Sequence, residues 1–199
     1  MNTIVTLAPT SSEVRRRLLA AASGVTTAAL QTFAGVISLA PQRSGYYRMP
    51  IGGLRVDELL ELVNAKFPGA RDLLPALLTW HEQGSSATRQ RLDEFADLLA
   101  LLLAHQSTES KESRWLACAI ATAAMADNHL WQDLGLPNRG VLNSMMQAHF
   151  TALKAKNAGD MKWKKFFYRQ LCQQAEIPIC KSPSCAQCSD YGLCFGGED

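Results

Sequence analysis

Four cysteines close to the end of the chain have a spacing suited to metal binding, Cys180-x4-Cys185-x2-Cys188-x5-Cys194. Thiolates bind soft and borderline metals well, so four of them can enclose a zinc ion or ligate an iron–sulfur cluster. Structural zinc sites usually pair two Cys-x2-4-Cys units across a longer spacer, which this segment lacks. Three closely spaced thiolates are typical of cluster ligation, so the spacing favours an iron–sulfur cluster, with structural zinc as the alternative.

Cysteine usage also indicates a compartment. Apart from the segment between Cys172 and Cys194, the sequence of 199 residues contains a single cysteine, Cys118. Secreted chains held by disulfides are usually rich in cysteine throughout, so two disulfides among the C-terminal cysteines are the less favoured interpretation. Arg15–Arg17 precede an uncharged stretch, residues 18–42, but polar residues interrupt it too often for an export signal or a membrane span. We therefore expect a cytoplasmic protein with no membrane segment.

The rest of the chain must position these cysteines, and its pattern predicts helices almost throughout. Hydrophobic residues make up 47% of the sequence and charged residues 19%, which allows a sizeable core. Apolar residues recur at helical spacing, and no run of alternating residues is long enough to demand a sheet. The predicted helices cover roughly residues 12–22, an Ala-rich stretch to 39, 54–67, a segment around 73–78, 92–106, 115–125, a short piece within 129–139, 142–157 and 161–176.

These elements predict an all-α fold, a single helical domain with a cysteine-rich, metal-binding C-terminal loop. Residues 1–45 are expected to be an N-terminal helical extension, residues 46–176 the helical domain and residues 177–199 the loop. The periodicity ends before the loop, because Pro178 cannot continue the hydrogen-bond ladder of the last helix.

The last predicted helix places apolar and basic residues on different sides. Lys162, Lys165 and Arg169 are spaced to share one face, whereas Trp163 and Phe166 turn towards the core. Positive charge beside a cysteine loop would attract oxyanions and offset the charge of an anionic cluster, although a simply solvated face fits the pattern as well. Because the aromatic residues point inwards and the net charge is only +2, we expect no nucleic-acid binding.

For the other residues that can ligate metals, a structural role is favoured over metal binding. Cys172 lies on the apolar side of its helix, where packing in the core is favoured and metal ligation is the alternative, and Cys118 lies among apolar residues and is expected in the core. His129 and Asp133 are four residues apart and can either bind a metal or hold a loop by hydrogen bonds, of which the second is favoured. His149 lies on an apolar stripe, so it is expected in the core, with ligation of a heterometal as the alternative.

Several segments together resemble the NifQ family. The segment MKWKKFFYRQLC at residues 161–172, the four-cysteine spacing and Phe195-Gly196 closely resemble the C-terminal part of that family. The resemblance covers about residues 50–199, and we identify none in the first 45 residues. Upstream, HLWQDLGL at residues 129–136 and EFAD at 94–97 also resemble the family, and FPGA at 67–70 is a weaker similarity.

The resemblance implies a function in nitrogen fixation. NifQ proteins process molybdenum for the iron–molybdenum cofactor of nitrogenase, carry an iron–sulfur cluster that incorporates molybdenum, and donate to the cofactor assembly proteins. By this resemblance, Cys180, Cys185, Cys188 and Cys194 bind the cluster, and molybdate or a molybdenum donor supplies the metal. No nucleophile elbow, phosphate-binding loop or dinucleotide fingerprint is present, so we expect a metal donor and not a turnover enzyme. A zinc-stabilised protein-interaction module is the alternative function.

Overall fold

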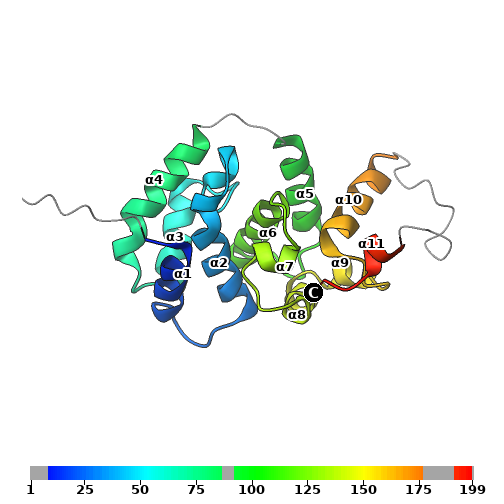
Figure 1. Cartoon of the computed structure of the whole chain (residues 1–199), viewed down its shortest axis with the longest axis horizontal. Helices are drawn as coiled ribbons and strands as arrows, with labels where there is room; N and C mark the ends of the chain where they lie inside the picture. Colours follow the sequence, from blue (N-terminus) through cyan, green and yellow to red (C-terminus); the bar gives the residue numbers. More distant parts are fainter. Residues whose placement is uncertain (1–8, 87–91, 177–190, 199) are drawn as a thin grey trace, which may run out of the picture.

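The computed structural model describes residues 9–86, 92–176 and 191–198, and in these ranges the chain is helical with no strand. This confirms the predicted all-α class (Figure 1). The buried side chains of the described residues form one hydrophobic core. The α-helices are α1 Ser11–Ala20, α2 Ala28–Leu39, α3 Val56–Lys66, α4 Leu74–Ser85, α5 Leu92–Ala104, α6 Lys111–Ala124, α7 Leu130–Asp133, α8 Arg139–His149, α9 Thr151–Lys156, α10 Trp163–Gln174 and α11 Tyr191–Phe195. Three short 3-10 turns join them, η1 Ala40–Gln42, η2 Gly45–Arg48 and η3 Arg71–Leu73.

Helices α2 and α6 form the centre of the molecule (Figure 1). Helix α2 carries no charged residue, and α6 is buried along almost its whole length from Trp115 onwards. A helix that is apolar on all sides must be surrounded by other helices. Accordingly, α2 packs against α1, α6 and α8, while α6 packs against α2, α5 and α7. The segment 1–45 thus contributes α2 to the same core as the rest of the chain.

The close packing of α2 depends on Gly35. A Cβ atom added there would lie 2.2 Å from the carbonyl oxygen of Leu134 and 2.9 Å from the Cα of Gly135. Gly135 itself has φ +68°, in the left-handed region that favours glycine. The turn that ends α7 therefore rests directly on the backbone of α2, which fixes the position of α7 against the core.

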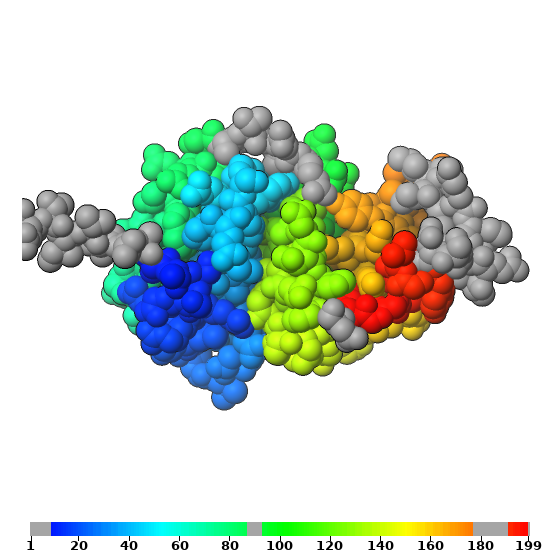
Figure 2. Space-filling view, viewed as in Figure 1, coloured from blue at the N-terminus to red at the C-terminus, as the bar shows by residue number. Residues whose placement is uncertain are grey.

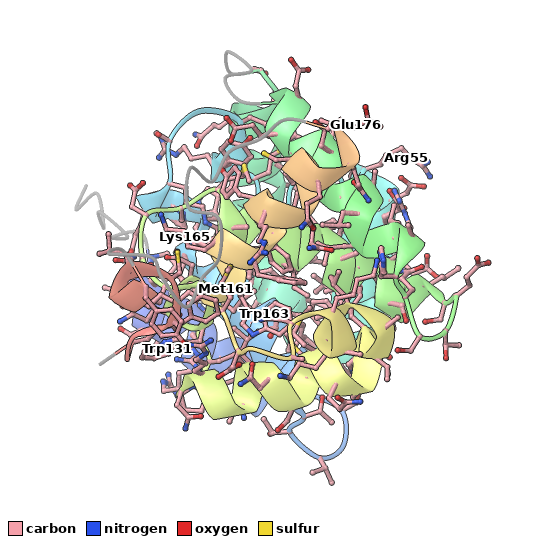
Figure 3. The ribbon with its side chains drawn as sticks, turned by 90° about the vertical axis from the view of Figure 1, so that its right-hand side faces the viewer. Arg55, Trp131, Met161, Trp163, Lys165 and Glu176 are labelled. Atoms are coloured by element: carbon pink, nitrogen blue, oxygen red, sulfur yellow. The ribbon has the colours of Figure 1, made fainter. Side chains whose placement is uncertain are left out.

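Helix α10 has the orientation that the sequence predicts. Trp163, Phe166 and Phe167 are buried, and their rings pack against one another with centroids 5.6–6.2 Å apart. The indole N–H of Trp163 also donates to the side-chain oxygen of Asn143 on α8, at 2.7 Å. The aromatic side thus ties α10 to the core, and Lys165 on the same helix is exposed (Figure 3).

Two local predictions were wrong. The stripe predicted as one helix over residues 142–157 is divided into α8 and α9 at Phe150, which has φ −139° and ψ 50°. Ser107, from a distant loop, donates its N–H to the carbonyl of His149 and accepts the N–H of Thr151 with its hydroxyl, both at 2.9 Å. Tertiary hydrogen bonds therefore hold the break. The second difference is α11, which forms in a segment where no helix was predicted.

Candidate metal centre

Of the four motif cysteines, the structure describes one. Cys194 lies in α11 and is half-buried, whereas Cys180, Cys185 and Cys188 lie outside the described residues. Within residues 9–86, 92–176 and 191–198, no three His, Cys, Asp or Glu side chains lie together as a metal site would require. The geometry of the candidate centre is therefore defined at its two flanks, the end of α10 and the start of α11.

Helix α11 is fixed against the base of α10. The backbone N–H of Lys162 donates to the carbonyl oxygen of Cys194 at 2.8 Å. Phe195 packs against the hydrophobic core and stacks on Tyr191, with ring centroids 4.5 Å apart. Figure 2 shows this helix in red, seated beside the orange and yellow segments of α10 and α9. The last cysteine of the motif thus has a defined place next to the basic helix.

The residues after α11 are also attached to the domain. The side chain of Glu198 is 6% exposed, and its Oε1 atom lies 3.6 Å from Nη1 of Arg139 and 3.7 Å from Nδ1 of His129. Arg139 also forms an ion pair with Asp160 at 3.4 Å. A carboxylate in such a sheltered position is stable only beside positive or donating groups. Glu198 therefore anchors the C-terminal end close to Cys194, a role that the sequence analysis did not anticipate.

The two histidines named as possible ligands have other surroundings. His129 precedes α7, donates its backbone N–H to Oε1 of Gln132 at 3.1 Å, and faces Glu198. His149 is half-buried at the end of α8. Asp133 is buried, and its carboxylate accepts hydrogen bonds from Asn128 at 3.0 Å and from Lys164 at 2.6 Å. These contacts fit the hydrogen-bonding alternative for the 129–133 segment, which positions α7.

The basic face predicted on α10 is present. Lys165 and Arg169 are exposed, and Lys162 is half-buried just before the helix begins. Lys164, between them, instead turns inwards and donates to Asp133 and to the carbonyl of Ala126, each at 2.6 Å. Helical spacing alone did not identify Lys164 as different, because its partners come from the distant segment around α7.

The other two cysteines differ in exposure. Cys118 is fully buried in α6, which confirms the predicted place in the core, and Cys172 is half-buried near the end of α10. Burial raises the pKa of the Cys118 thiol to about 12, an effect only partly opposed by the positive charge of Arg114. The thiolate is the form that binds metals and reacts as a nucleophile. Burial and the raised pKa both disfavour metal binding by Cys118.

Alkylation tests this conclusion. At pH 8 a thiol with such a pKa has a thiolate fraction on the order of one in ten thousand, and the side chain is also inaccessible. We expect iodoacetamide to modify accessible cysteines of the metal-free native protein while leaving Cys118 unmodified, and to modify all six in urea. Peptide mass spectrometry gives the count at each site. Rapid native labelling of Cys118 would contradict its burial.

A truncated chain tests how far the domain depends on the cysteine segment. Removing residues 177–199 deletes the acceptor of the Lys162 N–H, the half-buried Phe195 and the Glu198 carboxylate. We expect a loss of about 1–3 kcal/mol in the free energy of unfolding, since these are few and partly exposed contacts. Far-UV circular dichroism should still show most of the helix content. Unfolding of the truncated chain at 25 °C would show that the segment is a structural site.

Comparison with known proteins gives the family. A sequence model of the NifQ family matches residues 32–196, so the match begins upstream of the resemblance visible in the sequence. Protein NifQ of Azotobacter vinelandii is 37% identical over 163 residues, which are 79% of this chain and 84% of that protein. Protein NifQ of Rhodobacter capsulatus is 45% identical over 98 residues, 49% of this chain and 54% of that protein.

A shorter alignment is also to a protein of this name. Protein NifQ of Klebsiella pneumoniae is 50% identical over 82 residues, which are 40% of this chain and 48% of that protein. The aligned regions thus span about half the length of the Rhodobacter and Klebsiella proteins. No solved structure matches the chain. With the family model covering most of the sequence, including the four-cysteine motif, the chain belongs to the NifQ family.

Proposed function

We propose that this protein carries a molybdenum–iron–sulfur cluster, processes molybdenum, and donates it to the biosynthesis of the iron–molybdenum cofactor of nitrogenase. The observation that carries the proposal is the Cys180-x4-Cys185-x2-Cys188-x5-Cys194 motif in a chain of the NifQ family. The cluster is cargo, so the protein is a donor and not an enzyme with turnover. Its partners are then molybdate or a molybdenum donor on one side and nitrogenase cofactor assembly proteins on the other.

The donor set fits this cargo. Four thiolates suit the irons of an iron–sulfur cluster, and soft sulfur ligands also suit heavier metals. Cys194 is held by a backbone hydrogen bond that does not involve its sulfur, so the thiolate is available for ligation while the chain around it stays in place. The exposed Lys165 and Arg169 supply positive charge at the same end of the molecule. This charge would favour a dianion and an acidic partner alike.

The proposal also includes the surroundings in which the protein acts. Thiolates spaced this closely in the sequence are prone to oxidation, so we expect the protein to act in a reducing cytoplasm. None of the helices in the described part of the chain is long and apolar enough to cross a membrane. Trp163, Phe166 and Phe167 of α10 are buried, so these three rings are not presented for stacking on bases.

Metal analysis tests the proposal against the zinc alternative. The protein is produced with iron, sulfide and molybdate available, purified without oxygen, and analysed for iron, molybdenum, zinc and acid-labile sulfide. We expect a brown protein that contains iron, sulfide and molybdenum, with broad absorption near the border of the visible and ultraviolet ranges. A colourless protein with one zinc and no iron would overturn the proposal and support a zinc-stabilised interaction module.

Charge reversal on the basic face tests its part in the function. The variant Lys162→Glu/Lys165→Glu/Arg169→Glu changes the charge by about six units but should cost little stability, because Lys165 and Arg169 are exposed and Lys162 is half-buried, and surface substitutions usually stay within about ±0.5 kcal/mol each. We expect less molybdenum per iron and slower transfer to an acceptor, with iron content retained because thiolates hold the iron. The defect should shrink as salt rises, since charges are screened over ~8 Å at physiological ionic strength. Equal molybdenum content and transfer would show a merely solvated face.

A further inference from the structure

A pocket of about 280 Å³ lies between the end of α2 and the segment that joins α6 to α7. One wall comes from residues between 39 and 47, which include parts of the turns η1 and η2, and the other comes from residues between 125 and 133. None of the described lining residues belongs to α10 or α11. The pocket is therefore a different site from the candidate metal centre and from the basic face of α10.

Arg43 brings a partly buried positive charge to the first wall. Its Nη1 atom donates to the carbonyl oxygen of Tyr47 at 3.3 Å, and its Nη2 atom donates to the carbonyl oxygen of Val36. A guanidinium has more N–H donors than these two bonds use. Among the described residues, no carboxylate forms an ion pair with Arg43. Neutral carbonyl groups thus hold the cation in place and leave its charge without a direct partner.

Asp133, on the second wall, does not supply that partner. Its side chain is 6% exposed, and its carboxylate already accepts hydrogen bonds from Lys164 at 2.6 Å and from Asn128 at 3.0 Å. Burial lowers the pKa of Arg43 to about 10, an effect that the negative charge of Asp133 only partly opposes. A charge removed from water is normally paired with one of opposite sign. A ligand carboxylate at Arg43 would provide this pairing.

The second wall also carries a carboxylate that is not engaged. Asp127 is exposed and lines the pocket, and its side chain has no hydrogen bond or ion pair with another described residue. A second negative charge on a ligand would be repelled by this group, whereas an ammonium group would be attracted to it. The pocket therefore disfavours dianions and favours a molecule that carries one charge of each sign.

The neutral groups of the pocket suit a small polar molecule. Amide and hydroxyl side chains come from both walls, namely Gln42, Ser44, Asn128 and Gln132. The Nε2 atom of Gln42 donates to the hydroxyl of Ser11 on α1 at 2.9 Å, and Oε1 of Gln132 accepts the backbone N–H of His129 at 3.1 Å, so both amides are oriented. Met125, 7% exposed, adds apolar surface. Apolar surface with a few placed polar groups is typical of small-molecule sites.

We propose that this pocket binds a free amino acid, a small molecule with one carboxylate and one ammonium group. The guanidinium of Arg43 donates to the ligand carboxylate, and the carboxylate of Asp127 accepts from the ligand ammonium group. The amide and hydroxyl groups between them face the side chain of the ligand. The site goes beyond the proposed metal function, because none of its described residues belongs to the cysteine motif or to the basic face.

Equilibrium dialysis of the full-length protein against radiolabelled glycine, L-glutamine and L-leucine at low salt tests the site. We expect saturable binding of at least one of them below about 10 mM. The variants Arg43→Gln and Asp127→Asn each remove one charge from the pocket. Arg48→Gln and Asp97→Asn are the matched controls, because both residues are exposed and neither lines the pocket. Binding should weaken roughly tenfold for Arg43→Gln, about threefold for Asp127→Asn and less than about twofold for the controls.

Derivatives of the amino acid that binds test the two charges separately. The N-acetyl derivative lacks the ammonium group and the α-amide lacks the carboxylate, so both should displace the labelled amino acid less well than the amino acid itself does. In Asp127→Asn the disadvantage of the N-acetyl derivative should shrink, because the ammonium group has lost its acceptor.

Circular dichroism reports whether each variant is folded. Asp127→Asn changes an exposed side chain without a described partner, so this variant and the two derivatives decide the proposal even where Arg43→Gln fails to fold. Absence of saturable binding for all three amino acids would overturn the site, as would equal losses in the lining variants and their controls. Displacement by either derivative as effective as that by the amino acid would overturn the assignment of a ligand with both charges.

Discussion

Replacement of Cys180, Cys185, Cys188 and Cys194 by alanine is expected to remove all iron and sulfide from the protein while leaving it folded. Iron–sulfur clusters are held by thiolate bonds, and alanine offers no ligand in their place. The fold should survive because the only described member of the set, Cys194, is half-buried and bonds to Lys162 through its backbone carbonyl. Anaerobic iron and sulfide analysis together with visible absorption gives the readout, and circular dichroism reports the helix content.

Two single variants serve as controls for this experiment. Cys118→Ala should retain full iron, because its thiol is buried in α6 far from ionisation. Cys172→Ala distinguishes the two roles considered for that residue, since a packing cysteine can be lost without loss of iron. Iron retained by the fourfold variant would show that the motif is not the cluster site. Iron lost from Cys172→Ala would add this residue to the ligand set.

Removal of the Asp133 carboxylate is expected to cause the largest loss of stability among the polar residues. The Asp133 side chain is 6% exposed and that of Lys164 19%, and their charged atoms lie 2.6 Å apart. Breaking a buried ion pair by removing one partner typically costs about 3–5 kcal/mol, because the other charge stays buried without compensation. We therefore expect Asp133→Ala to lower the free energy of unfolding by about that amount. Urea unfolding followed by circular dichroism measures it.

An exposed ion pair provides the matched control. Lys111 and Glu61 also form a short contact, 2.5 Å, but their side chains are 73% and 45% exposed. Glu61→Ala should cost about 0–1 kcal/mol, the usual range for surface pairs. The double variant Asp133→Ala/Lys164→Met should recover much of the loss, because it removes the buried charge together with its partner. A small effect of Asp133→Ala alone would mean that water reaches Lys164 in the native state.

The pattern of apolar residues predicted most helices because each one buries a single stripe. Trp163, Phe166 and Phe167 are buried as their spacing in α10 indicates, and Leu59 and Val63 are buried in α3. Val56 continues the same helical spacing at the start of α3, but its side chain is 42% exposed. Periodicity identifies the side of a helix that faces the core, but not how far neighbouring helices extend along it.

Sequence periodicity by itself determined the helical class and the inward side of α10, and sequence similarity determined the family, because these properties are carried by residue types and local spacing. The tertiary structure alone decided which charges meet. Lys164 rather than Lys165 turns inwards because Asp133 at the end of α7 accepts its hydrogen bond. The side chain of Glu198 is buried because Arg139 and His129 lie beside it. Likewise, Ser107 divides α8 from α9 with bonds from a distant loop. Such contacts join segments far apart in the chain, so no local pattern encodes them.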